Sequence, residues 1–275
     1  MNARRMTAVA GAALLTFGLA ACGSDSESGS GSGGGGDAIK IGIKFDQPGL
    51  GLQDGGNFTG FDVDVANYVA KELGKTPEFI QAPSPQRETL IETGQVDLIF
   101  ATYSITDERK QKVSFAGPYF IAGQDLLVRE DSDITGVDGL DGKRLCSVSG
   151  STSAENVKKE VPGVQLREFD TYSECLDGLV NGQLDALTTD NTILAGYAAQ
   201  DQYKGKLKVV GNTFSEERYG VGLKKGDTEL CESVNKALEK MVSDGSWQKA
   251  VDDNFGPAGF KVDEDKNPPK VDACS

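Results

Sequence analysis

The sequence predicts an α/β protein made of two lobes, each built on a largely parallel sheet. Three observations indicate this fold class: short apolar stretches alternate with amphipathic helical stretches, the alternation occurs twice, and an extended apolar segment follows each copy. Strands that alternate with helices favour a parallel sheet with helices on both faces. Because the two copies share one topology without a close sequence repeat, we expect two lobes rather than one long sheet.

The first copy starts with a clear strand and helix. Residues 39–45 alternate between apolar and polar side chains and end near Pro48, which is typical of a strand followed by a turn. Apolar residues from Phe61 to Leu73 then recur every four positions, and this stripe predicts a helix that stops at Gly74. The remaining elements predicted for this copy are a strand at 78–82, a helix at 86–93 and a strand at 96–101.

The second copy repeats the order of the first. Its predicted elements are strands at 143–148, 164–169 and 184–188, with helices at 149–159 and 172–181. Two further extended segments, 123–129 and 218–224, lie outside the copies, and we interpret them as hinge strands between the lobes. Helices predicted at 229–244 and 246–253 complete the fold, and the proline-containing tail from Gly256 should be irregular.

The N-terminal segment has the pattern of an export signal. Arg4 and Arg5 precede a short apolar stretch, which is too short to cross a membrane comfortably. The stretch ends in small residues before Cys22, and this arrangement resembles the lipobox of bacterial lipoproteins, in which the cysteine is acylated. The alternative is an ordinary signal peptide followed by a chance cysteine. A Gly/Ser-rich stretch follows, and its composition predicts a flexible tether.

We therefore expect four parts along the chain. They are a lipoprotein signal peptide at 1–22, a linker at 23–37, lobe 1 at 38–123 and 217–275, and lobe 2 with the hinge strands at 124–216. The predicted location is the extracellular face of the cell membrane, with a lipid on Cys22 as the anchor.

Composition excludes several classes of protein. The formal charge is −14, and removal of Arg4 and Arg5 with the signal segment takes it to −16, which opposes binding to nucleic acid or anionic lipid. The chain contains no histidine, which disfavours common zinc sites and histidine-dependent catalysis. We expect no cofactor, no metal and no catalytic residue. A ligand that is an anion would need specific arginines or lysines in its pocket.

Four cysteines remain after Cys22, namely Cys146, Cys175, Cys231 and Cys274. An even number in an exported chain predicts two disulfides, for which three pairings exist. We favour Cys146–Cys175 and Cys231–Cys274, because each pair would then lie within one compact region. The alternative is a set of free buried thiols; no CxxC motif indicates metal or redox chemistry.

Ligands of open α/β sheets bind outside the carboxyl ends of the strands, and polar residues follow several strands here. After the strand that ends at Ala101, the hydroxyls of Thr102 and Ser104 precede Arg109. Hydroxyls, backbone amides and a guanidinium suit a carboxylate. The alternative is a helix cap beside a solvated arginine.

The second lobe offers a similar loop. Ser151 and Thr152 follow Gly150 at the start of a predicted helix, where free amides favour an anion. The alternative is simple N-capping. Asp190 follows the strand at 184–188, and its carboxylate suits an ammonium group or, alternatively, a helix cap.

Two further cations lie near predicted strand ends. Lys44 ends the first strand, and Arg87 opens the helix after Pro85. Either side chain could meet a second carboxylate of a ligand. The alternative is a solvated surface cation.

Several motifs in consistent order resemble family 3 extracellular solute-binding proteins, the polar amino acid receptors of ABC importers. They are NFTGFDVDVA, RETLIETGQVDLIFATYSITDER and SFAGPYF. GIKFDQPGLG, LCSVSGST and DALTTDNTILAGY look like the glutamate-binding lipoproteins of actinobacteria. The resemblance covers the whole chain after the linker. It implies a bilobal type II periplasmic-binding-protein fold that closes on its ligand.

The resemblance also implies roles for single residues. Arg109 should bind the ligand α-carboxylate, assisted by Ser104 and the backbone near Thr102. Thr152 and the Ser151 amide should contact the same carboxylate from lobe 2, and Asp190 should bind the α-ammonium. Phe45 or Leu50 is expected to take the place of the family's stacking aromatic, since the loop after the first strand departs from the family's Tyr-x-Pro-Phe form.

Lys44 indicates the class of ligand. In several basic amino acid receptors of this family a carboxylate occupies the matching place, so Lys44 reverses the sign of the charge that the ligand side chain meets. Arg87 is a second candidate for binding the distal carboxylate. We therefore expect glutamate, with aspartate or glutamine as alternatives, bound by a monomer that delivers it to ABC permease subunits. Alternatives of another class are an exported dehydratase on the same fold and an amino acid sensor.

Overall fold

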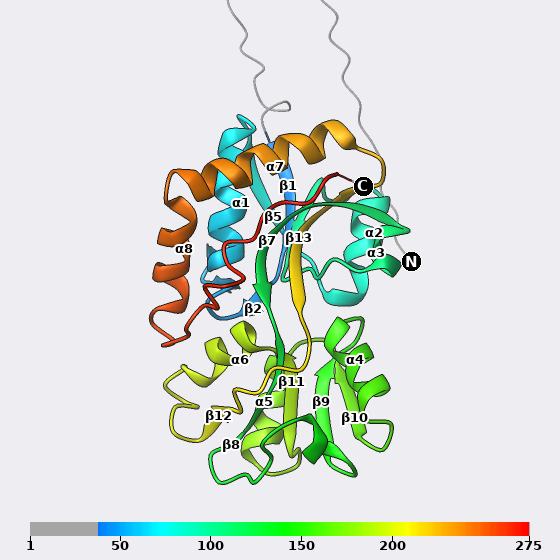
Figure 1. The fold of residues 1–275 in the computed structure, drawn as a ribbon, viewed down its shortest axis with the longest axis vertical. Helices are drawn as coiled ribbons and strands as arrows, with labels where there is room; N and C mark the ends of the chain where they lie inside the picture. Colours follow the sequence, from blue (N-terminus) through cyan, green and yellow to red (C-terminus); the bar gives the residue numbers. More distant parts are fainter. Residues whose placement is uncertain (1–37, 275) are drawn as a thin grey trace, which may run out of the picture. The chain divides into compact units, whose positions relative to one another are not determined.

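The computed structural model describes residues 38–274, which lie in one compact unit. The unit contains two five-stranded sheets, which define two lobes (Figure 1). Both sheets are mixed and carry helices, so the predicted bilobal α/β fold is confirmed. The predicted signal peptide, Cys22 and the linker lie outside the described residues.

Lobe 1 contains the sheet with strand order β5-β1-β6-β13-β7. Its strands are β1 (Ala38–Ile43), β5 (Thr76–Gln81), β6 (Leu98–Phe100), β7 (Val113–Ala122) and β13 (Glu217–Lys224). Its helices are α1 (Phe61–Glu72), η1 (Ser84–Gln86), α2 (Arg87–Glu92), α3 (Asp107–Lys110), α7 (Thr228–Ser243) and α8 (Ser246–Phe255). Strands β5, β1 and β6 are parallel, whereas β13 runs antiparallel to β6 and β7.

Lobe 2 contains the sheet with strand order β10-β9-β11-β8-β12. Its strands are β8 (Gln124–Arg129), β9 (Arg144–Val148), β10 (Gln165–Phe169), β11 (Ala186–Asp190) and β12 (Leu207–Val209). Its helices are η2 (Val137–Leu140), α4 (Thr152–Glu160), α5 (Ser173–Val180) and α6 (Asn191–Ala198). Strands β10, β9 and β11 are parallel, and β8 is antiparallel to β11 and β12.

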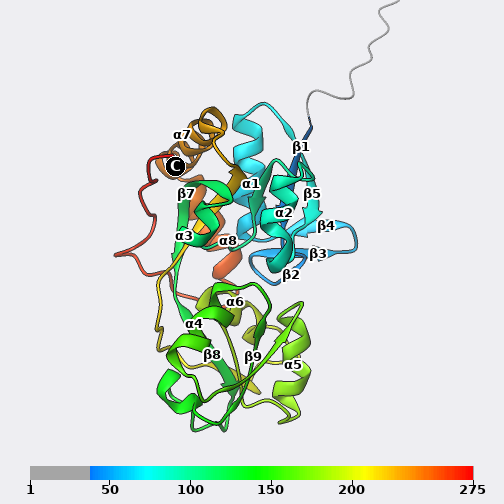
Figure 2. The ribbon, with the colours of Figure 1, turned by 90° about the vertical axis from the view of Figure 1, so that its right-hand side faces the viewer.

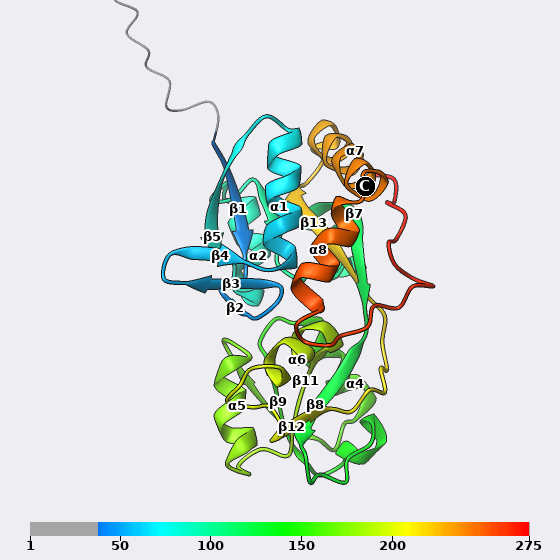
Figure 3. The same ribbon diagram turned by 90° about the vertical axis from the view of Figure 1, so that its left-hand side faces the viewer.

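A small third sheet lies at the edge of lobe 1 that is nearer to lobe 2 and extends to the side (Figure 3). It is formed by β2 (Asp46–Gln47), β3 (Gly51–Asp54) and β4 (Asn57–Thr59), where the sequence indicated only a turn. Gly60 at its end has φ 121°, and a side chain there would collide with the backbone of Leu50. The sheet places β2 beside α6 of lobe 2, as all three ribbon views show.

Strand β7 also has no counterpart among the predicted elements. All ten of its residues are buried, so it lacks the alternation of apolar and polar side chains that marks a strand with one exposed face. It continues through Gly123 into β8, and the chain returns through residues 210–216 into β13 (Figure 2). Two extended connections therefore join the lobes. The segments predicted as hinge strands lie within the two sheets, β13 in the sheet of lobe 1 and β8 in the sheet of lobe 2.

An aromatic cluster forms the centre of lobe 1. Phe61 of α1 lies 5.4 Å from Phe120 and 5.2 Å from Phe255 between ring centroids, and Trp247 packs on Phe120. Burial of such rings is the main favourable term in folding. No helix within residues 38–274 is both long and apolar enough to cross a membrane.

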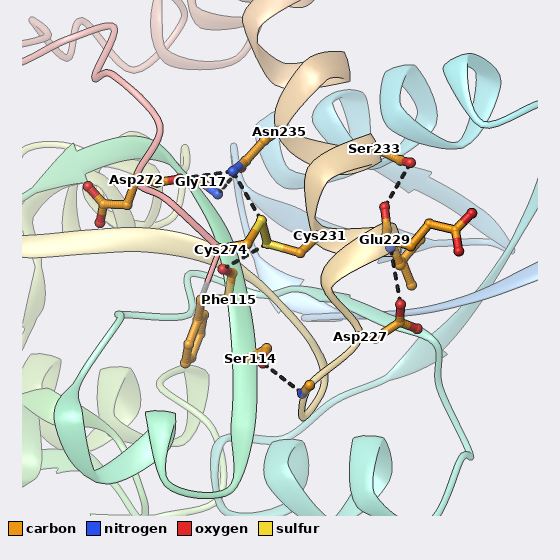
Figure 4. Close-up of a disulfide and its surroundings, with 12 residues drawn as sticks. Ser114, Phe115, Gly117, Asp227, Glu229, Cys231, Ser233, Asn235, Asp272 and Cys274 are labelled. Atoms are coloured by element: carbon orange, nitrogen blue, oxygen red, sulfur yellow. Dashed lines mark hydrogen bonds between the residues drawn. A yellow bond between two sulfur atoms is a disulfide. The ribbon is translucent and has the colours of Figure 1, made fainter.

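Both disulfides join the favoured pairs. Cys146 of β9 is bonded to Cys175 of α5 within lobe 2. Cys231 of α7 is bonded to Cys274 in the C-terminal segment, which runs along lobe 1 (Figure 4). Asn235 lies beside this second disulfide, where it accepts the Gly117 amide hydrogen and donates to the Asp272 carbonyl. The end of the chain is thereby fixed to α7 and β7.

Candidate ligand-binding site

The predicted contact residues gather where the two lobes meet. Most of them lie at or after the carboxyl ends of β1, β6, β9 and β11, as expected for open α/β sheets. Arg87 is the exception, because it begins helix α2 after β5. Seven are buried, with 8% or less of their surface exposed, and Thr152 is half-buried. The seven are Lys44, Arg87, Thr102, Ser104, Arg109, Ser151 and Asp190.

Direct hydrogen bonds join the lobes at this place. Arg109 Nη2 of lobe 1 donates to the Gly150 carbonyl of lobe 2 at 3.2 Å. The Tyr219 hydroxyl of β13 donates to Asp190 Oδ2 of lobe 2 at 2.6 Å. The Tyr197 hydroxyl of α6 donates to the Asp46 carbonyl at 2.7 Å. The structure is therefore a closed form, in which the site is shielded from solvent.

Arg109 is held in place by partners from both lobes. Besides its bond to Gly150, Nη1 donates to the Ser104 carbonyl at 2.7 Å, and Nε lies 3.4 Å from Glu88 Oε1. The guanidinium also packs on the ring of Tyr103, 4.8 Å from its centroid. These contacts leave part of its five-donor fork free for a planar anion.

Arg87 has a more internal position. Its Nη1 donates to the Ala101 carbonyl at 3.0 Å, its Nε donates to the Ser84 carbonyl at 3.3 Å, and the guanidinium packs on Tyr103. Burial and the neighbouring charge of Arg109 lower its pKa to about 10. Arg87 thus fixes the end of β6 and contributes positive potential, whereas a direct ligand contact stays a prediction.

Lys44 is a buried cation with few partners. Its Nζ donates to Ser84 Oγ at 2.8 Å and carries two further hydrogens. Burial lowers the pKa of Lys44 to about 7, and the charges of Arg87 and Arg109 act in the same direction, against Asp46 and Asp62. An anion placed beside Nζ would restore its charge.

Asp190 is a buried carboxyl group that would be stabilised in its charged form by a cation. Tyr219 donates to Oδ2, but Oδ1 is buried and has no hydrogen-bond partner among the described residues. Burial and the charge of Glu217 raise the pKa of Asp190 to about 8. Asp190 precedes α6, yet within the described chain its side chain makes no capping hydrogen bond, so capping does not explain this carboxylate. A cationic donor in the site would satisfy Oδ1.

Ser104 and Thr152 form a hydrogen-bonded chain between the lobes. Their hydroxyl oxygens are 3.3 Å apart, and Thr152 Oγ1 donates to Glu217 Oε2 at 2.9 Å. Because a hydroxyl carries one hydrogen, Ser104 must donate to Thr152. Beside this contact lies a cavity of about 300 Å³, which Ser104, Thr152 and Glu217 help to line. The larger cavity of about 730 Å³ near α6 and β12 contains none of the predicted contact residues.

Thr102 and Ser151 direct most of their polar groups into the protein. The Thr102 amide donates to Asp62 Oδ2 at 2.8 Å. Ser151 is the N-cap of α4, because its Oγ accepts from the Ala154 amide, and its own amide donates to the Val148 carbonyl. Capping therefore describes Ser151 in this closed form, and the ligand contacts of both residues stay predictions.

Sequence reasoning missed three buried polar residues at the site. Asp62 accepts hydrogen bonds from Thr102 and Tyr119, and burial raises its pKa to about 6. Glu217 accepts from Thr152, and Gln47 is fully buried beside Thr102. Acidic residues are ordinary in the first turn of a helix, so the position of Asp62 carried no distinct signal.

Both candidates for a stacking residue pack against the core of lobe 1. Phe45 packs on Phe58, with ring centroids 5.2 Å apart, and Leu50 is fully buried in the core of lobe 1. The loop after β1 therefore presents polar groups, chiefly Lys44 and Gln47, where an aromatic ring was expected.

Comparisons with known proteins agree with this geometry. Residues 39–257 match the model of bacterial extracellular solute-binding proteins, family 3. The glutamate-binding protein GluB of Corynebacterium glutamicum is 47% identical, with 94% of this chain and 93% of that protein covered. The ABC transporter glutamine-binding protein GlnH of Bacillus subtilis is 39% identical, with 78% and 79% covered.

One solved structure is similar to this protein in both fold and sequence. An ancestral arginine-binding protein bound to glutamine has a TM-score of 0.75 and 38% identity, with 80% of this chain and 98% of that chain covered. With a matching family model over most of the chain, relatives of nearly equal length and a bilobal fold with a shielded polar site, the protein belongs to family 3 of the bacterial extracellular solute-binding proteins.

Proposed function

We propose that this protein is the glutamate receptor of an ABC importer. In this proposal the chain is anchored outside the cell by a lipid on Cys22, stands off the membrane on the linker at 23–37, and acts as a monomer that delivers its ligand to permease subunits. The observation that carries the choice of ligand is Lys44, a cation buried in the closed site with only Ser84 as a hydrogen-bond partner among the described residues.

The two ends of the site suit the two ends of an α-amino acid. The free donors of Arg109 suit the α-carboxylate, because a guanidinium binds a carboxylate through parallel hydrogen bonds. The partnerless Oδ1 of Asp190 suits the α-ammonium, because a cationic donor beside a buried carboxyl favours its ionised form and supplies the missing hydrogen bond. Their opposite signs and their positions on different lobes favour one orientation of a zwitterion.

The distal carboxylate of glutamate then meets Lys44. The pKa of Lys44 is lowered to about 7 because burial removes its hydration, and a neighbouring carboxylate would compensate for that loss and stabilise the charged form. Glutamine offers an uncharged oxygen at the same place, and a basic side chain would be repelled. Lys44 therefore favours glutamate over both.

Ligand binding and closure of the two lobes are thermodynamically coupled. A ligand held by Arg109 of lobe 1 and Asp190 of lobe 2 contacts both lobes only in the closed form, and it shifts the population toward that form. No chemical step is needed for this function, and the named relatives are solute-binding proteins. We infer a receptor without catalytic activity; loss of a cyclic amino acid precursor during incubation with the protein would contradict this.

Calorimetric titration against the twenty common amino acids tests the proposal. We expect the protein lacking residues 1–22 to bind glutamate most tightly. Lys44→Met should reduce the preference for glutamate over glutamine by about 30-fold or more, as for loss of a partner of a buried charge. Lys40→Met is the matched control, because Lys40 lies in β1, four residues before Lys44, and is exposed. An unaltered preference in Lys44→Met would contradict glutamate as the ligand.

A further inference from the structure

Gln47 is a buried amide with one end left without a partner. It lies in β2, is 0% exposed, and its Nε2 has no hydrogen-bond partner among the described residues. Its neighbour Asp46 accepts the inter-lobe hydrogen bond from Tyr197, so β2 lies directly at the junction of the lobes. An unsatisfied amide is costly in a closed interior, and its presence indicates that another molecule supplies the missing partner.

Gln47 and Lys44 lie side by side. Gly51 pairs with Gln47 in the β2–β3 ladder, and a Cβ built on Gly51 would be 2.6 Å from the Lys44 carbonyl oxygen and 3.2 Å from Lys44 Cβ. Both residues therefore pack against the same glycine. Their side chains end in one polar network, because Gln47 Oε1 lies 3.3 Å from Thr102 Oγ1, Lys44 donates to Ser84, and Arg87 donates to the carbonyls of both Ser84 and Ala101.

The contact of Gln47 with Thr102 allows two orientations of the amide. Gln47 Oε1 lies 3.3 Å from Thr102 Oγ1, but the single hydrogen of this hydroxyl also has the Ala101 carbonyl within 2.8 Å. When Thr102 donates to Ala101, its oxygen can accept from Gln47 Nε2 after a half-turn of the amide. One end of the amide then pairs with Thr102 in either orientation, and the other end stays free.

We propose that the free end of the Gln47 amide contacts the distal group of the bound amino acid and lets the site accept a carboxamide as well as a carboxylate. The proposal rests on the proposed function, because it assumes an amino acid with its distal group at Lys44. With Nε2 free, the amide donates to a carboxylate oxygen of glutamate. With Oε1 free, it accepts a hydrogen from the carboxamide nitrogen of glutamine. Lys44 sets the preference, and Gln47 supplies a partner for either ligand.

Three variants and the unchanged protein, all lacking residues 1–22, test this proposal. In Gln47→Leu the side chain keeps a similar volume but loses both amide atoms. In Gln47→Glu it keeps the shape but can no longer donate to a carboxylate. Gln53→Leu is the matched control, since Gln53 lies on the neighbouring strand β3 and is exposed. Each protein is titrated with glutamate and with glutamine by calorimetry, and its unfolding temperature without ligand is recorded.

We expect Gln47→Leu to weaken both ligands about tenfold, as for loss of one buried hydrogen bond, and to leave the ligand-free unfolding temperature unchanged or higher. Gln47→Glu should weaken glutamate about tenfold more than glutamine, because it places like charges together. A residue with only a structural role would instead lower the unfolding temperature.

The inference is wrong if Gln47→Leu changes both affinities less than about threefold, or if the same fold-loss comes with a lower unfolding temperature. It is also wrong if Gln47→Glu weakens the two ligands equally. These outcomes differ from failure of the proposed function, in which the unchanged protein itself binds neither glutamate nor glutamine.

Discussion

Gly196 provides a sharp test of closure, because a methyl group there should stabilise one form of the protein and exclude the other. Gly196 lies inside α6 of lobe 2, and a Cβ built on it would overlap the carbonyl oxygen of Pro48 in lobe 1. In the open form Gly196→Ala only replaces a glycine within a helix, which stabilises the helix by about 1 kcal/mol. In the closed form the lobes must move apart at this contact.

The magnitude follows from the hydrogen bonds that this movement breaks. The Tyr197 hydroxyl lies 2.7 Å from the Asp46 carbonyl oxygen and 3.2 Å from Asp46 Oδ2. Because the hydroxyl has one hydrogen, these contacts are one shared hydrogen bond with a charged acceptor group, which contributes about 1.5–3 kcal/mol and corresponds to a Kd weaker by roughly 10- to 160-fold. The ligand-free unfolding temperature should stay equal or rise.

Calorimetric titration with glutamate and thermal unfolding without ligand measure these two effects. Gly178→Ala is the control, because its methyl would be 2.8 Å from Leu184 Cδ1 of the same lobe and would alter stability without touching lobe 1. If Gly196→Ala binds within about threefold of the unchanged protein, then α6 and β2 do not meet in the bound state, and the closed geometry is wrong.

The other predictions concern different parts of the same account. Burial raises the pKa of Asp190 to about 8 and lowers that of Lys44 to about 7, so at pH ~6.5 the Asp190 carboxyl holds a proton that the ligand ammonium displaces, while most Lys44 is already charged. Glutamate binding at this pH should release a net proton, and Asp190→Asn should abolish the release seen by calorimetry in two buffers. Gly150→Ala should weaken binding more than Gly142→Ala; both glycines have φ near +70°, but only the methyl at Gly150 would meet Pro85 of the other lobe, at 2.8 Å. Replacing Cys231 and Cys274 by serine should lower the free energy of unfolding by about 4 kcal/mol in urea titration, from the loop of 43 residues that the disulfide closes, and equal stability would contradict a formed bond.

The parts of the fold that could be predicted are those with a regular pattern. The four-residue stripe of α1 and the alternation of β1 follow from their one-sided burial, and the structure contains both. Strand β7 is buried on both faces and therefore shows no alternation. The sheet β2–β4 consists of strands of two to four residues, too short for any period to be visible.

The candidate site could be located because strand ends obey a general rule. Asp190 and Thr102 were placed by the carboxyl ends of β11 and β6 alone. Gln47 could not be found in this way, because its role depends on which atom of its amide is left without a partner after the lobes close. Ser151 shows the converse limit: the same position suits a cap or a ligand contact, and only the hydrogen bond from Ala154 identifies the cap.

A crystal structure of the protein grown with glutamate tests the central claim most directly. We expect the amino acid enclosed between the lobes, with its ammonium on Asp190, its α-carboxylate on Arg109 and its distal carboxylate on Lys44. Electron density for glutamate elsewhere, or in this cleft with the distal carboxylate turned away from Lys44, would contradict the site.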